Sequence, residues 1–290
     1  MDTGTFTGFE LELEDPGIAW FRFNSPQRLN GMTTGIKRDL IEAVTQAQMD
    51  NAVRVLVFTG SGRAFCAGDD LNAYRGAELG GTPLVADIPP GHDSPLGTYN
   101  GLRTISQQLN TVVRGLDKLT IAAVNGIAIQ TGFSLALSCD FRIAAAGARL
   151  GSATLRFGLL PDEGGQYLLV QHLGLARALD FLMRKRIVTA EEALELGLVH
   201  EVVPADSLEA AATALANELA NGPQVSMRLL KRSLYNAAEL TWNQSLDEIA
   251  AKTAVSDHHP DAREGVAAFK DKREPRFNAW LDGGSGGHGA

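Results

Sequence analysis

The sequence is poor in cysteine and has no long apolar run. Its 290 residues include only two cysteines, Cys66 and Cys139, each among small or apolar residues. Two cysteines do not make a disulfide framework in a chain of this length, so a reducing, cytoplasmic location is expected. No segment has about 18 consecutive apolar residues, and the N-terminus lacks a basic stretch followed by an apolar one. We therefore expect no membrane span and no signal peptide.

Basic runs and metal-ligand patterns are also absent. The formal net charge is −8, and the sequence contains no long run of basic residues. A nucleic-acid-binding protein needs a concentrated basic face, so no nucleic-acid partner is expected. None of the six histidines stands at a ligand spacing from a second histidine or cysteine, so no metal is expected. The hydrophobic residues make up 44% of the chain, which is enough for a sizeable core.

The first 60 residues alternate between strand and helix patterns. Residues 9–13 and 18–23 read as two strands, and the turn sequence Asp15-Pro16-Gly17 between them predicts a hairpin. Thr33 or Thr34 can cap a helix, because apolar residues follow at helical spacing as far as residue 47. The β-branched run at 53–58 is typical of a buried parallel strand. This ββα order predicts an α/β protein.

The remaining chain begins with a Gly- and Pro-rich segment at residues 72–96. It predicts a long irregular loop, and such loops in compact domains are usually functional. A helix is expected over 99–117, a strand over 120–124 and another helix from about Gly132. Short strands are expected at 141–145, 149–151 and 199–203. Beyond Gly164 the pattern is otherwise helical, and the Gly-rich tail at 283–290 is expected to be flexible.

Three segments have the composition of a ligand site. Residues 60–71 follow a strand, and their glycines allow a ligand to approach the backbone, although a tight turn without a ligand fits equally well. Residues 122–140 hold a strand that breaks at Gly126 and a helix that starts near Gly132. Free amides at a helix start favour developing negative charge. Residues 156–165 place two carboxylates, Asp162 and Glu163, before a Gly-Gly helix entry.

Two of these segments carry recognisable motifs. Residues 64–71 read Ala-Phe-x-Ala-Gly-x-Asp-Leu and residues 123–128 read Ala-Val-Asn-Gly-x-Ala. Together with the leader at 25–30 and the C-terminal stretch at 261–277, they resemble the enoyl-CoA hydratase/isomerase (crotonase) superfamily. The resemblance implies a crotonase-like spiral of ββα units with a helical C-terminal region. It implies a core at 1–205 with the acyl-CoA site, a helical trimerisation region at 206–282 and a tail at 283–290.

The resemblance also implies the chemistry. Members stabilise a thioester enolate with two backbone amides, which by position are those of Asp69 and Thr131. One such donor contributes about 3 kcal/mol. The expected partner is an acyl-CoA thioester, with no separate cofactor because coenzyme A is part of the substrate, and the expected assembly is a homotrimer or homohexamer. The remaining candidate substrate contacts are Arg28, Ala64, Ala67, Gly68, Asp70, Leu71 and Gly132. Further candidates for the CoA phosphates are Lys270, Lys272 and Arg273.

The sequence departs from the family's hydratases at both of their water-positioning glutamates. Ser134 and Thr154 occupy those positions, and a hydroxyl needs an activating partner to act as a base. The aspartate-dependent isomerases of the superfamily resemble this chain at Leu-Pro-Asp-x-Gly-Gly, which implies Asp162 as the base for double-bond migration. Alternatively, Asp162 caps the following helix. Glu163 is expected to be a solvated neighbour.

Other interpretations stay open on the sequence alone. The chain can be an atypical hydratase that lacks both glutamates, or a non-catalytic acyl-CoA binder. Residues 132–136 nearly match a serine-hydrolase nucleophile elbow at Ser134, but the last glycine is missing. Gln130-Thr131-Gly132 stands where the family has three glycines. Thr131 can still donate its amide there if its φ is negative.

Overall fold

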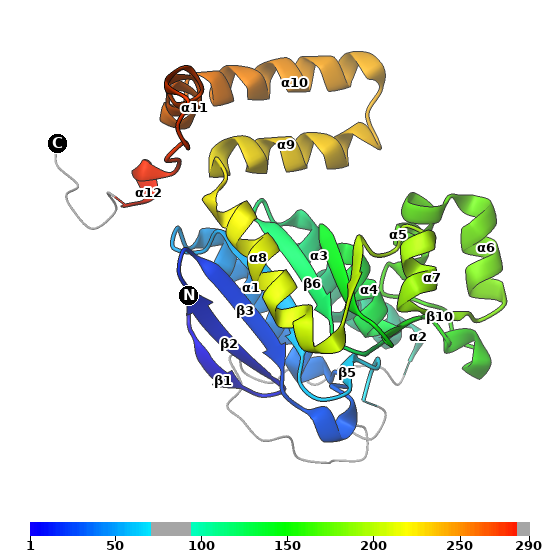
Figure 1. The fold of residues 1–290 in the computed structure, drawn as a ribbon. Helices are drawn as coiled ribbons and strands as arrows, with labels where there is room; N and C mark the ends of the chain where they lie inside the picture. The colour runs from blue at the N-terminus through cyan, green and yellow to red at the C-terminus, as the bar shows by residue number, and fades with distance from the viewer. Residues whose placement is uncertain (71–93, 283–290) are drawn as a thin grey trace.

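The computed structural model describes residues 1–70 and 94–282, and its larger sheet has the strand order β1-β2-β3-β4-β6-β8-β11 (Figure 1). The first three strands pair antiparallel, and the strands from β3 to β11 pair parallel. These strands are β1 (Gly4–Phe6), β2 (Phe9–Glu14), β3 (Ile18–Phe23), β4 (Val55–Gly60), β6 (Leu119–Val124), β8 (Phe141–Ala145) and β11 (Glu201–Val203).

A smaller sheet gathers three-residue strands in the order β10-β9-β7-β5. Its members are β5 (Ala64–Cys66), β7 (Ile127–Ile129), β9 (Arg149–Gly151) and β10 (Ile187–Thr189). β5, β7 and β9 pair parallel, and each follows shortly after a strand of the larger sheet. The smaller sheet therefore collects the chain at the carboxyl ends of β4, β6 and β8, which is the edge where α/β proteins bind ligands.

Alternating residues of the parallel strands pack on opposite faces, because successive side chains of a strand point to opposite sides. On β3, Phe21 and Phe23 join the core beneath α1 (Thr34–Met49), α3 (Gln107–Gly115) and α4 (Thr131–Ser138). Trp20 faces the other side, where α8 (Leu208–Asn221) covers the sheet. Both faces are covered, which explains the unbroken apolar run of β4.

The C-terminal helices extend away from the sheets (Figure 1). After α8 come α9 (Gln224–Ala237), α10 (Trp242–Asp257), α11 (Pro260–Asp271) and the short α12 (Ala279–Asp282). α10 has 16 residues and buries none of them in this single chain. The other α-helices are α2 (Pro95–Gly101), α5 (Gly165–Leu173), α6 (Leu175–Met183) and α7 (Ala190–Glu195). There are also short 3-10 helices, η1 (Pro26–Arg28), η4 (Thr154–Phe157) and η5 (Ala205–Ser207), and a π-helix, η3 (Leu102–Ser106).

The expected α/β class is confirmed. The hairpin forms as β2 and β3, and the Thr33 hydroxyl caps α1 by accepting from the amide of Ile36 at 3.2 Å. The expected helix at 99–117 spans α2, η3 and α3, and α2 already begins at Pro95. Most of the loop expected at 72–96, and the tail at 283–290, lie outside the described residues. No helix in residues 1–70 and 94–282 is long and apolar enough to cross a membrane.

Candidate active site

Two asparagines hold the Gly-rich segment that follows β4. The side-chain amides of Asn30 and Asn125 both donate to the carbonyl oxygen of Ala64, at 2.7 Å and 3.1 Å. The amide of Gly60 donates back to Asn125 Oδ1 at 3.1 Å. Asn125 belongs to the Ala-Val-Asn-Gly motif, so the second motif fixes the first.

The amide of Asp69 is turned away from the neighbouring chain. Met32 pairs with this segment: its amide donates to the Gly68 oxygen at 2.9 Å, and its oxygen accepts from the Asp70 amide at 2.9 Å. Successive peptide groups of an extended chain point to opposite sides, so the Asp69 amide points away from Met32. No hydrogen bond joins it to another described residue. It is therefore free to donate to a ligand, as expected for an oxyanion donor.

Thr131 is the first residue of α4, where an amide has no acceptor within the helix. Of the two non-glycine residues that stand at the family's glycines, Gln130 has a positive φ of 50°, whereas Thr131 is not in the left-handed region and can donate its amide. Gly132 packs so closely that a Cβ there would lie 2.1 Å from the Cys66 oxygen. This contact brings the start of α4 against the end of β5, and the Thr131 hydroxyl donates to Asp69 Oδ1 at 2.8 Å.

A buried lysine joins this pair. Lys37 Nζ from α1 lies 2.7 Å from Asp69 Oδ1 and 2.5 Å from Glu163 Oε1, and donates to Ser106 Oγ at 3.0 Å. The expectation that Glu163 is solvated is wrong, because its side chain is only 2% exposed and pairs with Lys37. A buried charged pair therefore lies beside the two candidate oxyanion donors.

The charges of this cluster do not balance. Burial raises the pKa of Glu163, and Asp69 raises it further, while Lys37 and the Thr131 hydroxyl lower it by a smaller amount. Burial lowers the pKa of Lys37, but Glu163 and Asp69 outweigh burial and hold it above its ordinary value. One lysine therefore faces two carboxylates, and the buried one is the harder to ionise.

The turn that carries Asp162 lies between α3 and α4. The side-chain amides of Gln107 and Asn110, both on α3, donate at 2.9 Å to the carbonyl oxygens of Asp162 and Glu163 respectively. A Cβ at Gly165 would lie 2.8 Å from Ser134 Oγ, which brings this turn against the first turn of α4. The alternative that Asp162 caps α5 is wrong: the N-cap is Gly164, and no side chain makes the capping bond.

The other candidate contacts have local partners. Arg28 Nη1 lies 2.5 Å from Asp70 Oδ2, so these two bind each other. Ala64 is buried and Ala67 half-buried, while Leu71 lies outside the described residues. Thr154 Oγ1 lies 3.2 Å from Ser152 Oγ. Arg273 pairs with Glu264 at 2.7 Å. Their roles toward a substrate stay predictions.

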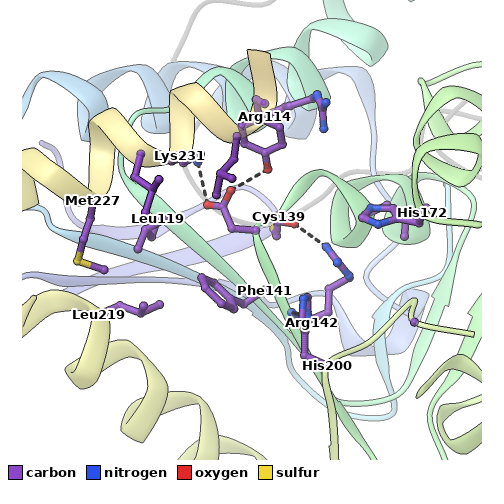
Figure 2. A pocket seen from close by; sticks show the side chains of 16 residues that line it. Arg114, Leu119, Cys139, Phe141, Arg142, His172, His200, Leu219, Met227 and Lys231 are labelled. Atoms are coloured by element: carbon purple, nitrogen blue, oxygen red, sulfur yellow. Dashed lines mark hydrogen bonds and ion pairs between the residues drawn. The ribbon is translucent and has the colours of Figure 1, made fainter. Parts of the chain in front are cut away.

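A cavity of about 500 Å³ lies at the opposite end of the parallel strands (Figure 2). It is lined at the amino ends of β6 and β8 and by α9, with Leu119, Phe141, Met227 and Lys231 among its residues. None of Asp69, Thr131 and Asp162 lines it. Since parallel sheets bind ligands beyond their carboxyl ends, we place the candidate active site at the Asp69–Thr131 end. Among the described residues no group of three or more His, Cys, Asp or Glu is placed to hold a metal.

Comparison with known proteins identifies the family. The model of the enoyl-CoA hydratase/isomerase family matches residues 14–83 and 86–279. The chain belongs to the enoyl-CoA hydratase/isomerase family. It is 35% identical over 272 residues to 1,2-epoxyphenylacetyl-CoA isomerase of Escherichia coli K12, covering 93% of this chain and 98% of the relative. It is 29% identical over 254 residues to 2,3-dehydroadipyl-CoA hydratase of the same organism, covering 88% of this chain and 92% of the relative.

Solved structures of the family share the fold. The enoyl-CoA hydratase of Bacillus anthracis superposes with a TM-score of 0.83 at 29% identity, covering 93% of this chain and 98% of that one. The enoyl-CoA hydratase of Mycobacterium smegmatis gives 0.82 at 26% identity, with coverages of 93% and 98%. The expected crotonase superfamily and fold are thereby confirmed.

Sequence reasoning missed Lys37. It lies three residues before Leu40 and four before Ile41, so it shares their face of α1, which packs in the core against the larger sheet. Lysine is almost never fully buried unless it is paired. The position of Lys37 on the apolar face of α1 therefore predicts, from the sequence alone, a buried carboxylate partner.

Proposed function

We propose that this enzyme moves the double bond of an enoyl-CoA thioester between the β,γ and α,β positions, with Asp162 as the base. The observation that carries the proposal is the packing of the Asp162 turn against the first turn of α4. That turn begins with Thr131, whose side chain bonds to Asp69. A carboxylate and two free amides thus come from neighbouring segments.

The chemistry needs these groups together. A thioester α-proton is too weakly acidic to remove unless the enolate oxygen is stabilised. The amides of Asp69 and Thr131 would donate to that oxygen, and the first turn of α4 adds favourable backbone dipoles. Asp162 would take the α-proton, the electrons would delocalise over the dienolate, and the same carboxyl group would return the proton at the γ-carbon. No water is consumed.

Hydration is the second candidate. It requires a base that activates water, and Ser134 and Thr154 replace both family glutamates. Ser134 is buried, and no described base contacts its hydroxyl, so it lacks an activating partner. The E. coli relative is named as an isomerase of an epoxide, 1,2-epoxyphenylacetyl-CoA, so its name supports isomerisation of a CoA thioester but not double-bond migration itself, while the hydratase names of others favour this second candidate.

The test is Asp162→Asn, which keeps the shape of the side chain and removes the base. The isomerase rate on a β,γ-enoyl-CoA should fall by roughly 10²-fold or more, since general-base catalysis contributes about that much. Binding of the substrate should change far less, and deuterium exchange at the α-carbon should disappear. An unchanged isomerase rate would exclude Asp162. No turnover of any enoyl-CoA by the wild type would favour a non-catalytic binder.

We also propose assembly into a trimer or a pair of trimers. α9 exposes Leu230 and Leu234, and α10 exposes Trp242, whose side chain is 75% exposed. A 16-residue helix with no buried residue needs a partner to cover its apolar side chains. Light scattering that shows a stable 30.9 kDa monomer at micromolar concentration would contradict this. The cytoplasmic location and the contacts of Arg28, Lys270 and Lys272 with CoA remain predictions.

A further inference from the structure

A continuous chain of polar contacts joins the two amides to the turn of the base. It starts at Thr131, whose hydroxyl donates to Asp69 at 2.8 Å. Asp69 is paired with Lys37 at 2.7 Å, and Lys37 with Glu163 at 2.5 Å. Glu163 is the next residue after Asp162. The contacts thus cross from α4 and the segment after β5, through α1, to the turn before α5.

The pair at the centre of this chain is expensive to bury. The side chains of Lys37 and Glu163 are 3% and 2% exposed. Removing two charges from water costs several kcal/mol per ion, and a well-packed apolar pair is often as stable or more stable. Glu163 Oε2 has no hydrogen-bond partner among the described residues. The raised pKa of Glu163, which burial causes, is a further sign of this cost. Stability alone therefore does not explain the pair.

Both oxyanion-donor residues, Asp69 and Thr131, have side chains that bond to neighbouring groups. Thr131 lies where the family has a flexible glycine, and its hydroxyl is bonded. Asp69 is bonded by two partners at the same oxygen. A side-chain bond at each residue limits how its peptide plane can rotate. This matters because a backbone donor must lie within about 3 Å of the oxyanion to be effective.

We infer that Lys37 and Glu163 are positioning residues that hold the Asp69 and Thr131 amides in register with the turn carrying Asp162. The inference rests on the proposed function for the identity of the base, and on the two amides for the identity of the oxyanion hole. Neither residue needs to touch the substrate. Their effect is to keep the carbonyl and the α-proton of one bound thioester within reach of their separate partners, since small misplacements cost large factors in rate.

The decisive variant is Lys37→Met combined with Glu163→Leu. The single change Lys37→Met leaves two carboxylates facing each other and can prevent folding, whereas the double change removes both buried charges and fills their space. We expect the double variant to fold, to keep KM within a few-fold, and to lose roughly 10- to 100-fold in kcat. Thr131→Val, which removes only the hydroxyl tie, should lose less.

A spectroscopic measurement separates positioning from general stability. Hexanoyl-CoA labelled with ¹³C at the thioester carbonyl is bound to each variant, and its carbonyl stretch is recorded by infrared difference spectroscopy. Two aligned donors lower the frequency relative to free hexanoyl-CoA. The double variant should lose at least half of this shift. The matched control is Asp140→Leu with Lys231→Met, which removes a buried lysine–carboxylate pair at the other end of the sheet and should keep the full shift.

The outcomes distinguish this inference from the proposed function. A double variant that keeps the full shift and the wild-type kcat overturns the positioning role, as does the absence of any shift in the wild type. Asp162→Asn should keep the shift, because it changes the base alone. If Asp162→Asn keeps its isomerase rate while the double variant loses the shift, the proposed base is wrong and the positioning role stands.

Discussion

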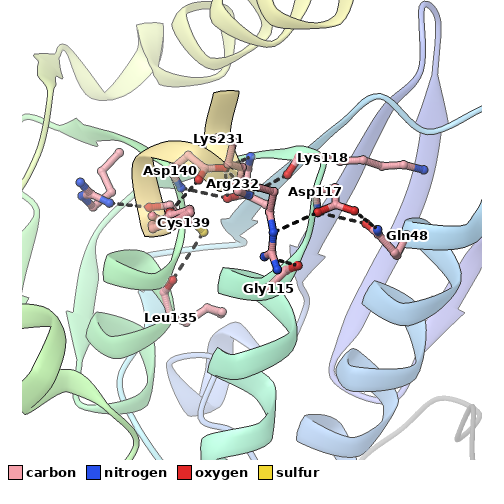
Figure 3. Close-up of polar contacts among 12 residues, drawn as sticks. Gln48, Gly115, Asp117, Lys118, Leu135, Cys139, Asp140, Lys231 and Arg232 are labelled. Atoms are coloured by element: carbon pink, nitrogen blue, oxygen red, sulfur yellow. Dashed lines mark hydrogen bonds and ion pairs between the residues drawn. The ribbon is translucent and has the colours of Figure 1, made fainter. Parts of the chain in front are cut away.

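Lys37 and Lys231 are both buried and both paired, but they lie at opposite ends of the parallel strands. Lys231 Nζ donates to Asp140 Oδ2 and to the Lys118 carbonyl, each at 2.8 Å (Figure 3). Asp140 also accepts from the amide and hydroxyl of Thr120, at 2.8 Å and 2.9 Å, and from the Tyr235 hydroxyl at 2.7 Å. One lysine thus meets one carboxylate whose oxygens are both used.

The Lys37 cluster differs in charge and in completeness. It has two carboxylates for one ammonium group, and one buried oxygen of Glu163 has no partner among the described residues. The pKa of Lys37 is accordingly raised, whereas burial, only partly offset by Asp140, lowers the pKa of Lys231. The Lys231–Asp140 pair, whose polar atoms all have partners, fastens α9 to the sheet, and we call it the α9 joint. The Lys37 cluster, which has an excess carboxylate and an oxygen with no described partner, marks a place where function outweighs stability.

The largest expected effect is a loss of unfolding free energy when the Lys231–Asp140 pair at the α9 joint is broken. Asp140→Leu leaves Lys231 buried without a carboxylate, which costs about 3–5 kcal/mol of unfolding free energy. Chemical denaturation should show a lower midpoint, and assembly should weaken because α9 is attached there. Asp180→Ala removes a partly exposed carboxylate of α6 that pairs with Arg184 and Arg186, and should change the midpoint little. An Asp140→Leu protein as stable as the wild type would show that the joint contributes nothing.

At the site end, Gly132→Val should abolish most activity. The added Cβ would meet the Cys66 oxygen at 2.1 Å and Cys66 Cβ at 2.7 Å, so the start of α4 must move. Losing one aligned donor costs roughly 10²-fold in kcat. Gly35→Ala is the control, because its Cβ would meet nothing closer than 3.7 Å. Near-normal kinetics for Gly132→Val would mean that the oxyanion hole lies elsewhere.

Replacing each carboxylate by its amide sharpens the comparison. Glu163→Gln removes the excess negative charge beside Lys37, so we expect an unchanged or slightly higher unfolding free energy. Asp140→Asn removes the single counter-charge of Lys231 and should cost about 1–3 kcal/mol. Denaturation of both variants in parallel tests this. Equal losses at the two positions would show that the clusters do not differ in kind.

The smallest effect concerns the two thiols, one near each cluster. Burial raises the pKa of Cys66 and of Cys139 to about 12 each, and both side chains are almost fully inaccessible. Because the thiolate is the reactive form, native protein at pH 8 should react with a thiol reagent at neither position. Unfolded protein should titrate two thiols. Rapid native labelling of Cys66 would show that the segment before Asp69 opens readily.

Much of the fold could be predicted from the sequence, because its longer helices and strands show regular patterns of apolar and polar residues. The β2–β3 hairpin follows from alternation around Asp15-Pro16-Gly17, and α1 follows from the Thr33 cap. Of the six three-residue strands among the described residues, β1, β5, β7 and β10 were not predicted, because so short a segment shows little periodicity. Their positions depend on pairing with distant strands, which one sequence does not encode locally.

Only part of the candidate site could be predicted from the sequence. Asp69, Thr131 and Asp162 could be named from motifs, but the contact between Asp69 and Thr131 side chains depends on the register of β5 against α4. Glu163 was misjudged because neighbouring carboxylates before a Gly-Gly pair look alike in sequence. Its burial follows from Asn110 holding its carbonyl and from Lys37 reaching it across 126 positions.

The most direct measurement of the central claim follows the wild-type enzyme with 3-hexenoyl-CoA and with crotonyl-CoA in deuterated water, using NMR. We predict that 3-hexenoyl-CoA is converted to 2-hexenoyl-CoA with deuterium entering at the γ-carbon, that crotonyl-CoA gains water far more slowly, and that Asp162→Asn abolishes the conversion. Brisk hydration of crotonyl-CoA that Asp162→Asn does not slow would contradict the isomerase assignment.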